Sequence, residues 1–264
     1  MAKNIVVIGI DCQNDFMEGG NLAVAGALDD MLRFSECILA NIGHISDIIM
    51  TLDSHHLNDI GHASFWINSK GEHPAPFTVI SVADIEAGTW FSRFGSLRVW
   101  TLDYAKSLAA QGKYPLLIWP DHCLIGSPGA AIEAKIFAAI NQWAKIRGGV
   151  VSFITKGSNI KSEHYSAVKT EVPVAEDQGT QLNTHLIHEL LGKADEIWVG
   201  GEAASHCVLS TMNDIWDNLP DEYAKKFVLL KDCMSPVGGF EQAAQDFYVS
   251  ASARGVRVCN STEL

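Results

Sequence analysis

The chain of 264 residues contains no apolar run near the ~20 residues that a membrane-spanning helix requires. Its six cysteines show no CxxC pair and no regular spacing, which argues against a disulfide framework or a structural zinc knuckle. Such cysteine usage fits a reducing cytosol. Basic residues are scarce, with 19 Lys and Arg against 31 Asp and Glu and a formal charge of −12. Because phosphate binding depends on a basic surface, we expect neither nucleic acid nor a membrane as a partner.

The N-terminus also lacks a recognisable leader. The segment MAKNIVVIGID enters a strand-like run at once and shows no small-residue cleavage site. We therefore expect a cytoplasmic protein.

What the chain does have is an alternation of apolar, β-branched runs with amphipathic segments. At 47% hydrophobic residues, it can bury the core of one large domain covering 1–264. The apolar runs predict six strands, at 4–10, 47–52, 150–155, 196–200, 227–230 and 256–259. Helical periodicity predicts helices at 28–39, 129–147, from 180 or 183 to 191, 205–216 and 241–253. This order predicts an α/β fold of three α/β/α layers around a six-stranded, mostly parallel sheet.

One segment breaks the alternation. At about 66–118 the pattern is irregular, with weak strand-like pieces at 78–82 and 97–101 and a short helix at 104–110. We expect an insertion on the ligand-bearing rim of the sheet, acting as a lid, a specificity wall or an oligomer contact.

The segment IWVGGEAASHCV at 197–208 predicts a strand, a turn and a helix capped by Ser205, with Cys207 in its first turn. A cysteine at the carboxyl edge of a parallel sheet lies where such folds bind ligands. Asp11 and Lys156 follow two other predicted strands, so all three side chains meet if the strands are neighbours. A carboxylate beside a thiol can accept its proton, and an ammonium group favours the ionised pair. The alternatives are a packed cysteine, a turn-capping aspartate and a solvated lysine.

A second cluster, in TLDSHHLNDIGHASFW, consists of Asp53, His55, His56 and His62. Carboxylate and imidazole ligands suit zinc, iron or manganese, and Asp53 and His55 are spaced to reach one ion from an extended strand end. Two ligands are too few, and His122 in IWPDHC is the candidate for a third. The alternative is that these histidines are surface residues of a polar loop.

Taken together, the motifs resemble the nicotinamidases (pyrazinamidases) of the isochorismatase-like cysteine hydrolases. The matching pieces are DCQNDFMEGGNLAV at 11–24, the Asp53/His55 pair with HASF at 62–65, WPDHCLIGSPGA at 119–130, TKG at 155–157 with EHYSAV at 163–168, and AASHCV at 203–208. They occur in the family's order and leave out much of 66–118, parts of 170–185 and the region after 216.

The resemblance implies the roles of individual residues. A catalytic triad would consist of Asp11, Lys156 and Cys207. One divalent metal ion, zinc with iron or manganese as alternatives, would be held by Asp53, His55, His122 and waters, with His62 as a further ligand in some members. Substrate contacts would come from Phe16, Trp119 and Tyr165, and the oxyanion hole from the backbone N–H groups of Ala203 and Cys207. A cis Glu202–Ala203 peptide bond is also implied.

The activity implied is a metal-dependent amide hydrolysis, of nicotinamide to nicotinate and ammonia, through a cysteine thioester. The expected partner is a small nicotinamide-like amide, and a homo-oligomer is left open. Alternatives are another amide or carbamoyl substrate, the vinyl-ether hydrolysis of isochorismatases, or a catalytically silent binding protein of this fold. The triad and the ligand set together favour the nicotinamidase-type site, since isochorismatases lack the nucleophilic cysteine.

The sequence also departs from the family pattern. Glu202 stands where an apolar residue usually precedes the cis bond, and Ser205 stands where many members have an acidic residue. The spacing from Asp53 to His62 is longer than in most members.

Overall fold

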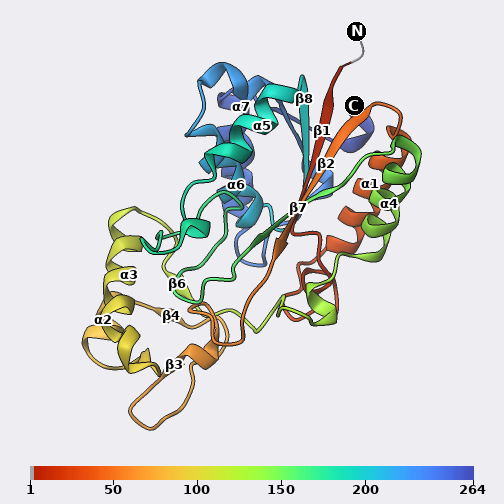
Figure 1. The fold of residues 1–264 in the computed structure, drawn as a ribbon. Helices are drawn as coiled ribbons and strands as arrows, with labels where there is room; N and C mark the ends of the chain where they lie inside the picture. The colour runs from red at the N-terminus through yellow and green to blue at the C-terminus, as the bar shows by residue number, and fades with distance from the viewer. Residues whose placement is uncertain (1–2) are drawn as a thin grey trace.

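The computed structural model describes residues 3–264, with side chains given throughout except at 189–193. These residues form a six-stranded parallel sheet in the order β10-β9-β8-β1-β2-β7 (Figure 1). The strands are β1 (Ile5–Ile10), β2 (Ile45–Asp53), β7 (Ser152–Lys156), β8 (Glu196–Gly201), β9 (Phe227–Leu230) and β10 (Arg257–Cys259). All six predicted strands are confirmed, with ends shifted by a few residues.

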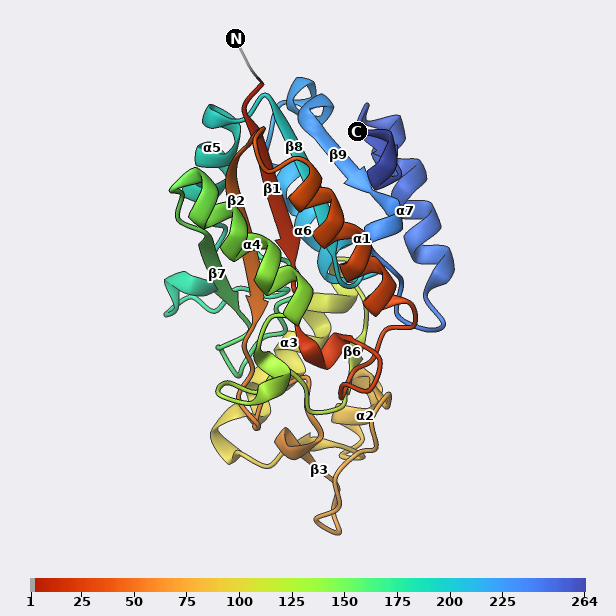
Figure 2. The ribbon, with the colours of Figure 1, turned by 90° about the vertical axis from the view of Figure 1, so that its right-hand side faces the viewer.

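Helices cover both faces of this sheet, which confirms the three-layer α/β/α prediction. Figure 2 shows α1 (Ala27–Ala40) and α4 (Ala134–Arg147) on one face, with α5 (Thr184–Lys193), α6 (Cys207–Trp216) and α7 (Glu241–Ala253) behind the sheet. The pleat of β1 explains the two cores, because successive side chains of a strand point to opposite faces. Val7 packs with Phe34 and Trp143 on one side, whereas Ile8 packs with Met212 on the other.

The helix ends follow local signals. Helix α1 buries Ala27, Met31, Phe34 and Ile38, a helical stripe that faces the sheet. The helix predicted over 129–147 starts five residues later, at Ala134. Glu133 caps α4, since its side chain accepts hydrogen bonds from the N–H groups of Lys135 and Ile136. Residues Pro128–Ala130 form a separate 3-10 turn.

The segment at 66–118 folds into a small lobe beyond the carboxyl ends of the strands (Figure 1). It contains β3 (Trp66–Ile67), β4 (Val79–Ile80), α2 (Val82–Glu86), β5 (Phe91–Ser92), α3 (Arg98–Ala110) and β6 (Leu116–Leu117). The strand-like piece at 78–82 contains β4, and the helix predicted at 104–110 lies within α3. The strand predicted at 97–101 is wrong, because α3 begins at Arg98. Helix α3 buries Thr101, Tyr104 and Leu108, which are three and four residues apart and so lie on one face of the helix.

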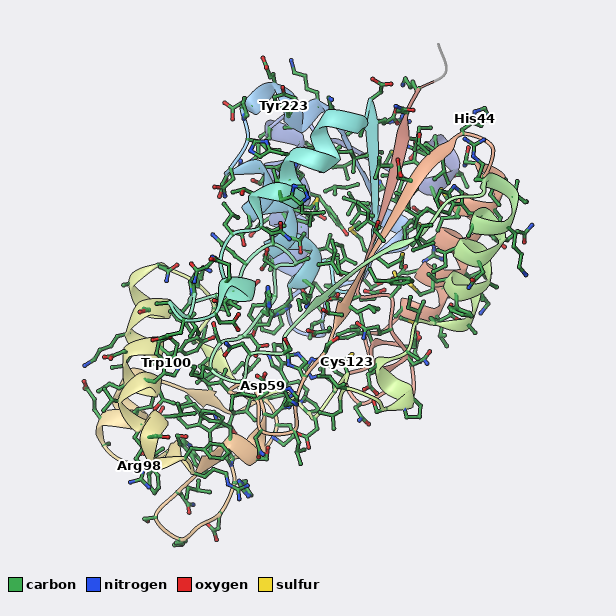
Figure 3. The ribbon with its side chains drawn as sticks, viewed as in Figure 1. His44, Asp59, Arg98, Trp100, Cys123 and Tyr223 are labelled. Atoms are coloured by element: carbon green, nitrogen blue, oxygen red, sulfur yellow. The ribbon has the colours of Figure 1, made fainter. Side chains whose placement is uncertain are left out.

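The lobe has its own apolar core, which includes Phe65, Trp66 and Tyr104. It contacts the loop after β7, because Nε1 of Trp100 donates to the Lys161 carbonyl at 2.7 Å. Trp100 is labelled in Figure 3. Among residues 3–264, no helix combines the length and the apolar character needed to cross a bilayer.

Candidate functional site

Three adjacent strands deliver charged side chains to one edge of the sheet. Asp11 follows β1, while Asp53 and Lys156 end β2 and β7 and are partners in register. Asp11 adopts a left-handed backbone conformation (φ 45°), which is unfavourable for a residue with a Cβ. Thr51 secures it, accepting from the Asp11 N–H at 3.0 Å and donating its hydroxyl to Oδ1 at 2.5 Å. The Asp11 carboxylate is therefore fixed in place by the neighbouring strand.

The Lys156 side chain lies among these charged groups, with 1% of the residue's surface exposed. Its Nζ lies 2.9 Å from Oδ2 of Asp11 and 3.0 Å from Oδ1 of Asp53. It also donates to the carbonyl of His164 at 2.9 Å and approaches Sγ of Cys207 at 3.6 Å. The ammonium group is thus enclosed by two carboxylates, a carbonyl oxygen and a thiol.

The buried charges shift one another's proton affinity. Burial alone lowers the pKa of Lys156, but the charges of Asp11 and Asp53 outweigh burial and raise that pKa well above its usual value. Burial raises the pKa of Asp11, and Lys156 only partly opposes this shift. Burial also raises the pKa of the Cys207 thiol well above its usual value, again against the effect of Lys156. The cluster therefore combines a neutral thiol with a carboxylate of increased basicity, the requirement for proton transfer between them.

Cys207 is the first residue of α6 and is brought to Asp11 and Asp53. One ligand atom of each of the three residues lies within 4.8 Å of the other two. The predicted cap is wrong: His206 precedes the helix, and Ser205 Oγ instead contacts Nδ1 of His206 at 2.9 Å. The three predicted triad residues, from three distant segments, thus lie side by side.

The turn before Cys207 contains the cis Glu202–Ala203 bond, which confirms that prediction. It follows Gly201, whose φ of 124° suits glycine alone and where a Cβ would lie 1.9 Å from the Ile10 carbonyl oxygen. Among the hydrogen bonds of residues 3–264, none has the backbone N–H of Ala203 or Cys207 as donor. Both N–H groups are available to a substrate oxygen, as an oxyanion hole requires.

Asp53, His55 and His122 form a second buried cluster, with one ligand atom of each within 4.8 Å of the others. Nε2 of His55 lies 3.1 Å from Oδ2 of Asp53, and Nε2 of His122 lies 3.5 Å from the same oxygen. Nδ1 of His122 lies 2.9 Å from the carbonyl of Pro120, and a carbonyl only accepts, so Nδ1 carries the proton. In the neutral ring, Nε2 then presents a lone pair toward the carboxylate.

The other imidazole, His55, lies against a carboxylate that no sequence motif predicted. Its Nδ1 lies 3.2 Å from Oδ2 of Asp59, four residues further along, while neither ring nitrogen forms a hydrogen bond within residues 3–264. Figure 3 shows Asp59 beyond the carboxyl ends of the strands. Two ring nitrogens that converge on one buried carboxylate oxygen need a cation between them, which can be a proton on His55 or a metal ion. The donor set therefore fits a divalent metal ion with carboxylate and imidazole ligands.

The charges within this cluster favour the ionised form of Asp53, which is the form that binds a metal ion. Burial alone raises the pKa of Asp53, but His55 and Lys156 outweigh burial and lower that pKa well below its usual value. At His55 the charges of Asp53 and Asp59 outweigh burial and raise the pKa well above its usual value. A proton and a metal ion would therefore compete for Nε2 of His55.

Of the other two histidines of the predicted cluster, His62 lies next to the converging residues and His56 does not. His62 is buried, and its Nε2 lies 3.3 Å from Nδ1 of His122, on the side of that ring away from Asp53. His56 is exposed. The converging set is therefore Asp53, His55 and His122, with His62 behind it.

A narrow pocket lies beside Cys207. The predicted substrate contacts Phe16, Trp119 and Tyr165 all line it, and Nε1 of Trp119 donates to the Tyr165 hydroxyl at 3.0 Å. Its other lining residues are Leu22, Asp53, His122, Glu163, Ala203, His206, Cys207 and Val237. Glu163 and His206 were not predicted, although both belong to the quoted motifs EHYSAV and AASHCV. An aromatic-walled pocket that reaches a cysteine and two metal-ligand candidates suits a small planar molecule.

Comparison with known proteins finds distant relatives of the chain. No family model matches the sequence. The nicotinamidase/pyrazinamidase of Mycobacterium tuberculosis is 25% identical over 208 residues, covering 79% of this chain and 76% of the relative. The nicotinamidase of Acinetobacter baylyi is 28% identical over 215 residues, covering 81% of this chain and 75% of the relative.

Solved structures show the same fold at lower identity. An Acinetobacter baumanii nicotinamidase/pyrazinamidase matches with a TM-score of 0.64 at 21% identity, covering 99% of this chain and 98% of the other. The yeast nicotinamidase matches with a TM-score of 0.62 at 17% identity, covering 97% and 99%. The pyrazinamidase of Pyrococcus horikoshii, solved in complex with zinc, matches with a TM-score of 0.55 at 18% identity, covering 97% and 99%. The chain is thus similar in sequence, at 25% and 28% identity, to a nicotinamidase/pyrazinamidase and a nicotinamidase, and it shares the fold of solved nicotinamidases and pyrazinamidases.

Proposed function

We propose that this protein is a metal-dependent amidohydrolase that converts nicotinamide to nicotinate and ammonia, with Cys207 as the nucleophile. The observation that carries the proposal is the position of Lys156 Nζ, 2.9 Å from Asp11 and 3.6 Å from the Cys207 sulfur. At these distances the ammonium group of Lys156 can stabilise either the Asp11 carboxylate or the Cys207 thiolate. A proton can therefore move from Cys207 to Asp11 without leaving a buried charge unpaired.

The first half of the reaction forms a thioester. Asp11 takes the thiol proton as the Cys207 sulfur attacks the amide carbonyl carbon, and the backbone N–H groups of Ala203 and Cys207 hold the resulting oxyanion. Asp11 then returns the proton to the amide nitrogen, the C–N bond breaks and ammonia leaves. Lys156 stays protonated throughout and stabilises whichever neighbour is ionised.

The second half hydrolyses the thioester. Asp11 takes a proton from a water molecule, whose oxygen attacks the thioester carbonyl carbon, and the same two N–H groups hold the second oxyanion. The C–S bond then breaks, the proton returns to the sulfur, and the carboxylic acid is released. Atoms and charges balance with water as the only co-substrate.

The pocket determines which amide reaches Cys207. Phe16, Trp119 and Tyr165 offer aromatic surfaces to a planar ring. Asp53, His55 and His122 would hold zinc, with iron or manganese as alternatives, and His62 remains a further candidate ligand. When bound, the ion would supply a Lewis acid for a ring nitrogen and thereby orient the substrate.

The proposal includes a location in the cytoplasm. All six cysteines lie in the described part of the chain and are free thiols, which suits a reducing cytoplasm.

The test is ammonia release from nicotinamide, pyrazinamide and a series of aliphatic amides, before and after treatment with a chelator. The proposal predicts turnover of the aromatic amides and its loss on metal removal. Turnover restricted to aliphatic or carbamoyl compounds would overturn the substrate assignment and keep the cysteine chemistry. No turnover of any amide would favour a silent binding protein of this fold.

A further inference from the structure

A buried pair of carboxyl groups lies beside the turn that presents Ala203. Glu202, at the end of β8, is 0% exposed, and Asp30, on α1, is 2% exposed. The two groups lie close enough for each to influence the pKa of the other. Asp30 Oδ1 accepts from Arg33 at 2.6 Å, and Glu202 Oε2 accepts from the N–H of Ser235 at 3.2 Å. The remaining oxygens, Asp30 Oδ2 and Glu202 Oε1, have no hydrogen-bond donor within residues 3–264.

A single proton shared by the two carboxyl groups removes the repulsion between them. Two ionised carboxylates in buried contact repel each other, whereas a single shared proton turns one of the unpaired oxygens into a donor for the other. Burial and the charge of Asp30 raise the pKa of Glu202 well above its usual value. Burial also raises the pKa of Asp30, although hydrogen bonds from Ser235 and Arg33 oppose the shift. Glu202 is therefore the partner that carries the proton, and Asp30, beside Arg33, is the ionised one.

The other titratable groups around Glu202 add no positive charge. Glu18 is a further carboxylate near Glu202. The Cys12 thiol and the Tyr248 phenol lie close enough for Glu202 to raise the pKa of each. Arg33, acting through Asp30, is the cation of this cluster within the described part of the chain.

The pair is connected directly to the predicted oxyanion hole. On one side of Ala203, the N–H of Glu202 donates to the Ile10 carbonyl at 2.8 Å. On the other side, the N–H of Ala204 donates to the Ser235 carbonyl at 2.8 Å. Because the Glu202 carboxyl accepts from the N–H of Ser235, the side chain and the backbone of this turn are both fastened to one residue. The orientation of the Ala203 N–H follows from these contacts.

We propose that Glu202 is a positioning residue for the oxyanion hole, acting as a neutral carboxyl that shares one proton with Asp30. The role rests on the proposed amide hydrolysis. Loss of the shared proton at alkaline pH places two carboxylates in contact and loosens the turn that holds the Ala203 N–H. An apolar side chain at position 202 would fill the same space but could form neither the hydrogen bond with Asp30 nor the one from the Ser235 N–H.

The test compares three variants on the amide that the metal-loaded wild type hydrolyses, with kcat and KM measured from pH 6 to pH 10. Glu202→Gln keeps the size, donates to Asp30 through its NH₂ group and accepts from Ser235 through its carbonyl. We expect kcat within about twofold of wild type at neutral pH and an alkaline decline moved to higher pH. Glu202→Leu should lower kcat by about tenfold or more with little change in KM, since an oxyanion donor acts mainly in the transition state. Glu36→Gln, an exposed site on α1, is the matched control and should follow the wild type.

An unchanged alkaline decline in Glu202→Gln, or wild-type kcat in Glu202→Leu, would overturn the proposal. If the wild type hydrolyses no amide, the proposed function and the positioning role both fail, but the shared proton is decided separately by urea unfolding. A carboxyl that is protonated in the fold and ionised in the unfolded chain loses its stabilising contribution as pH rises. Glu202→Gln should therefore gain stability relative to wild type between pH 5 and pH 9, and Glu36→Gln should not. If Glu202→Gln gains no stability in this pH range, the shared proton is refuted, whatever the activity of the enzyme.

Discussion

The ammonium nitrogen of Lys156 lies 3.0 Å from Oδ1 of Asp53, while Oδ2 of the same carboxylate faces His55 and His122. One aspartate thus joins the cysteine cluster to the candidate metal centre. The link follows from the sheet, because Asp53 and Lys156 are register partners at the ends of β2 and β7. A substitution in either cluster should therefore affect the other through the position and charge of Asp53.

Replacing Lys156 by methionine should destabilise the fold as well as abolish turnover. It would leave Asp11 and Asp53 buried without their cation, and removal of one partner from a buried ion pair costs about 3–5 kcal/mol. Urea unfolding at neutral pH measures this loss. The exposed Lys145→Met on α4 is the control and should change stability by less than about 0.5 kcal/mol. A Lys156→Met protein as stable as wild type would show that the two carboxylates do not depend on this ammonium group.

Removal of one converging histidine should release the metal. We expect His122→Ala to retain roughly a tenth or less of the wild-type metal content after dialysis, since a three-ligand site that loses one imidazole holds a divalent ion weakly. Elemental analysis by mass spectrometry gives the content directly. His56→Ala, exposed and next to His55 in sequence, should keep the wild-type content. Equal metal content in both variants would place the ion elsewhere.

Gly201→Ala should destabilise the protein by about 3 kcal/mol or more, through both backbone strain and overlap. The added Cβ would lie 1.9 Å from the Ile10 carbonyl oxygen, at a φ of 124°. Gly43→Ala is the matched control, because nothing lies within 4 Å of its added Cβ. Chemical unfolding of the two variants side by side checks the difference, and equal midpoints would contradict the close packing of β8 on β1.

Acid should destabilise the fold in part through His206. Burial lowers the pKa of His206 to about 4, from an ordinary value of 6.5. Between these values the unfolded chain binds a proton that the folded protein does not, so stability falls as pH drops from about 6.5 to about 4. The full effect is on the order of 3 kcal/mol.

Unfolding measured across this range tests the contribution of His206. His206→Asn keeps a hydrogen-bonding atom near the place of Nδ1 and should lose less stability than wild type as the solution is acidified. The exposed His44→Asn should follow wild type (Figure 3). Parallel curves for His206→Asn and wild type would mean that His206 is already protonated, or accessible to water, in the folded protein.

Much of this arrangement could be predicted from the sequence because central parallel strands are buried on both faces. The run IVVIGI of β1 is buried throughout, so its composition alone marks it. The carboxyl ends of parallel strands share one edge, which is why Asp11, Lys156 and Cys207 could be predicted to meet. The resemblance to nicotinamidases then predicted the cis bond.

Other features depend on contacts that no local pattern reports. The start of α3 has the pattern of a strand because Leu97, Val99 and Trp100 have strand-like character, whereas burial of the helix is decided by the core of the 66–118 lobe. Asp59 has no signal beyond its spacing of four residues from His55. Its role against Nδ1 of that ring depends on how the loop folds.

The most direct test of the central claim is the initial rate of ammonia release from nicotinamide by metal-loaded wild type and by Cys207→Ala. We expect steady release by the wild type and a rate at least about 10³-fold lower for the variant, whose fold and metal content should be unchanged. Equal rates in the two proteins would contradict the claim, because the sulfur of Cys207 would then take no part in breaking the amide bond.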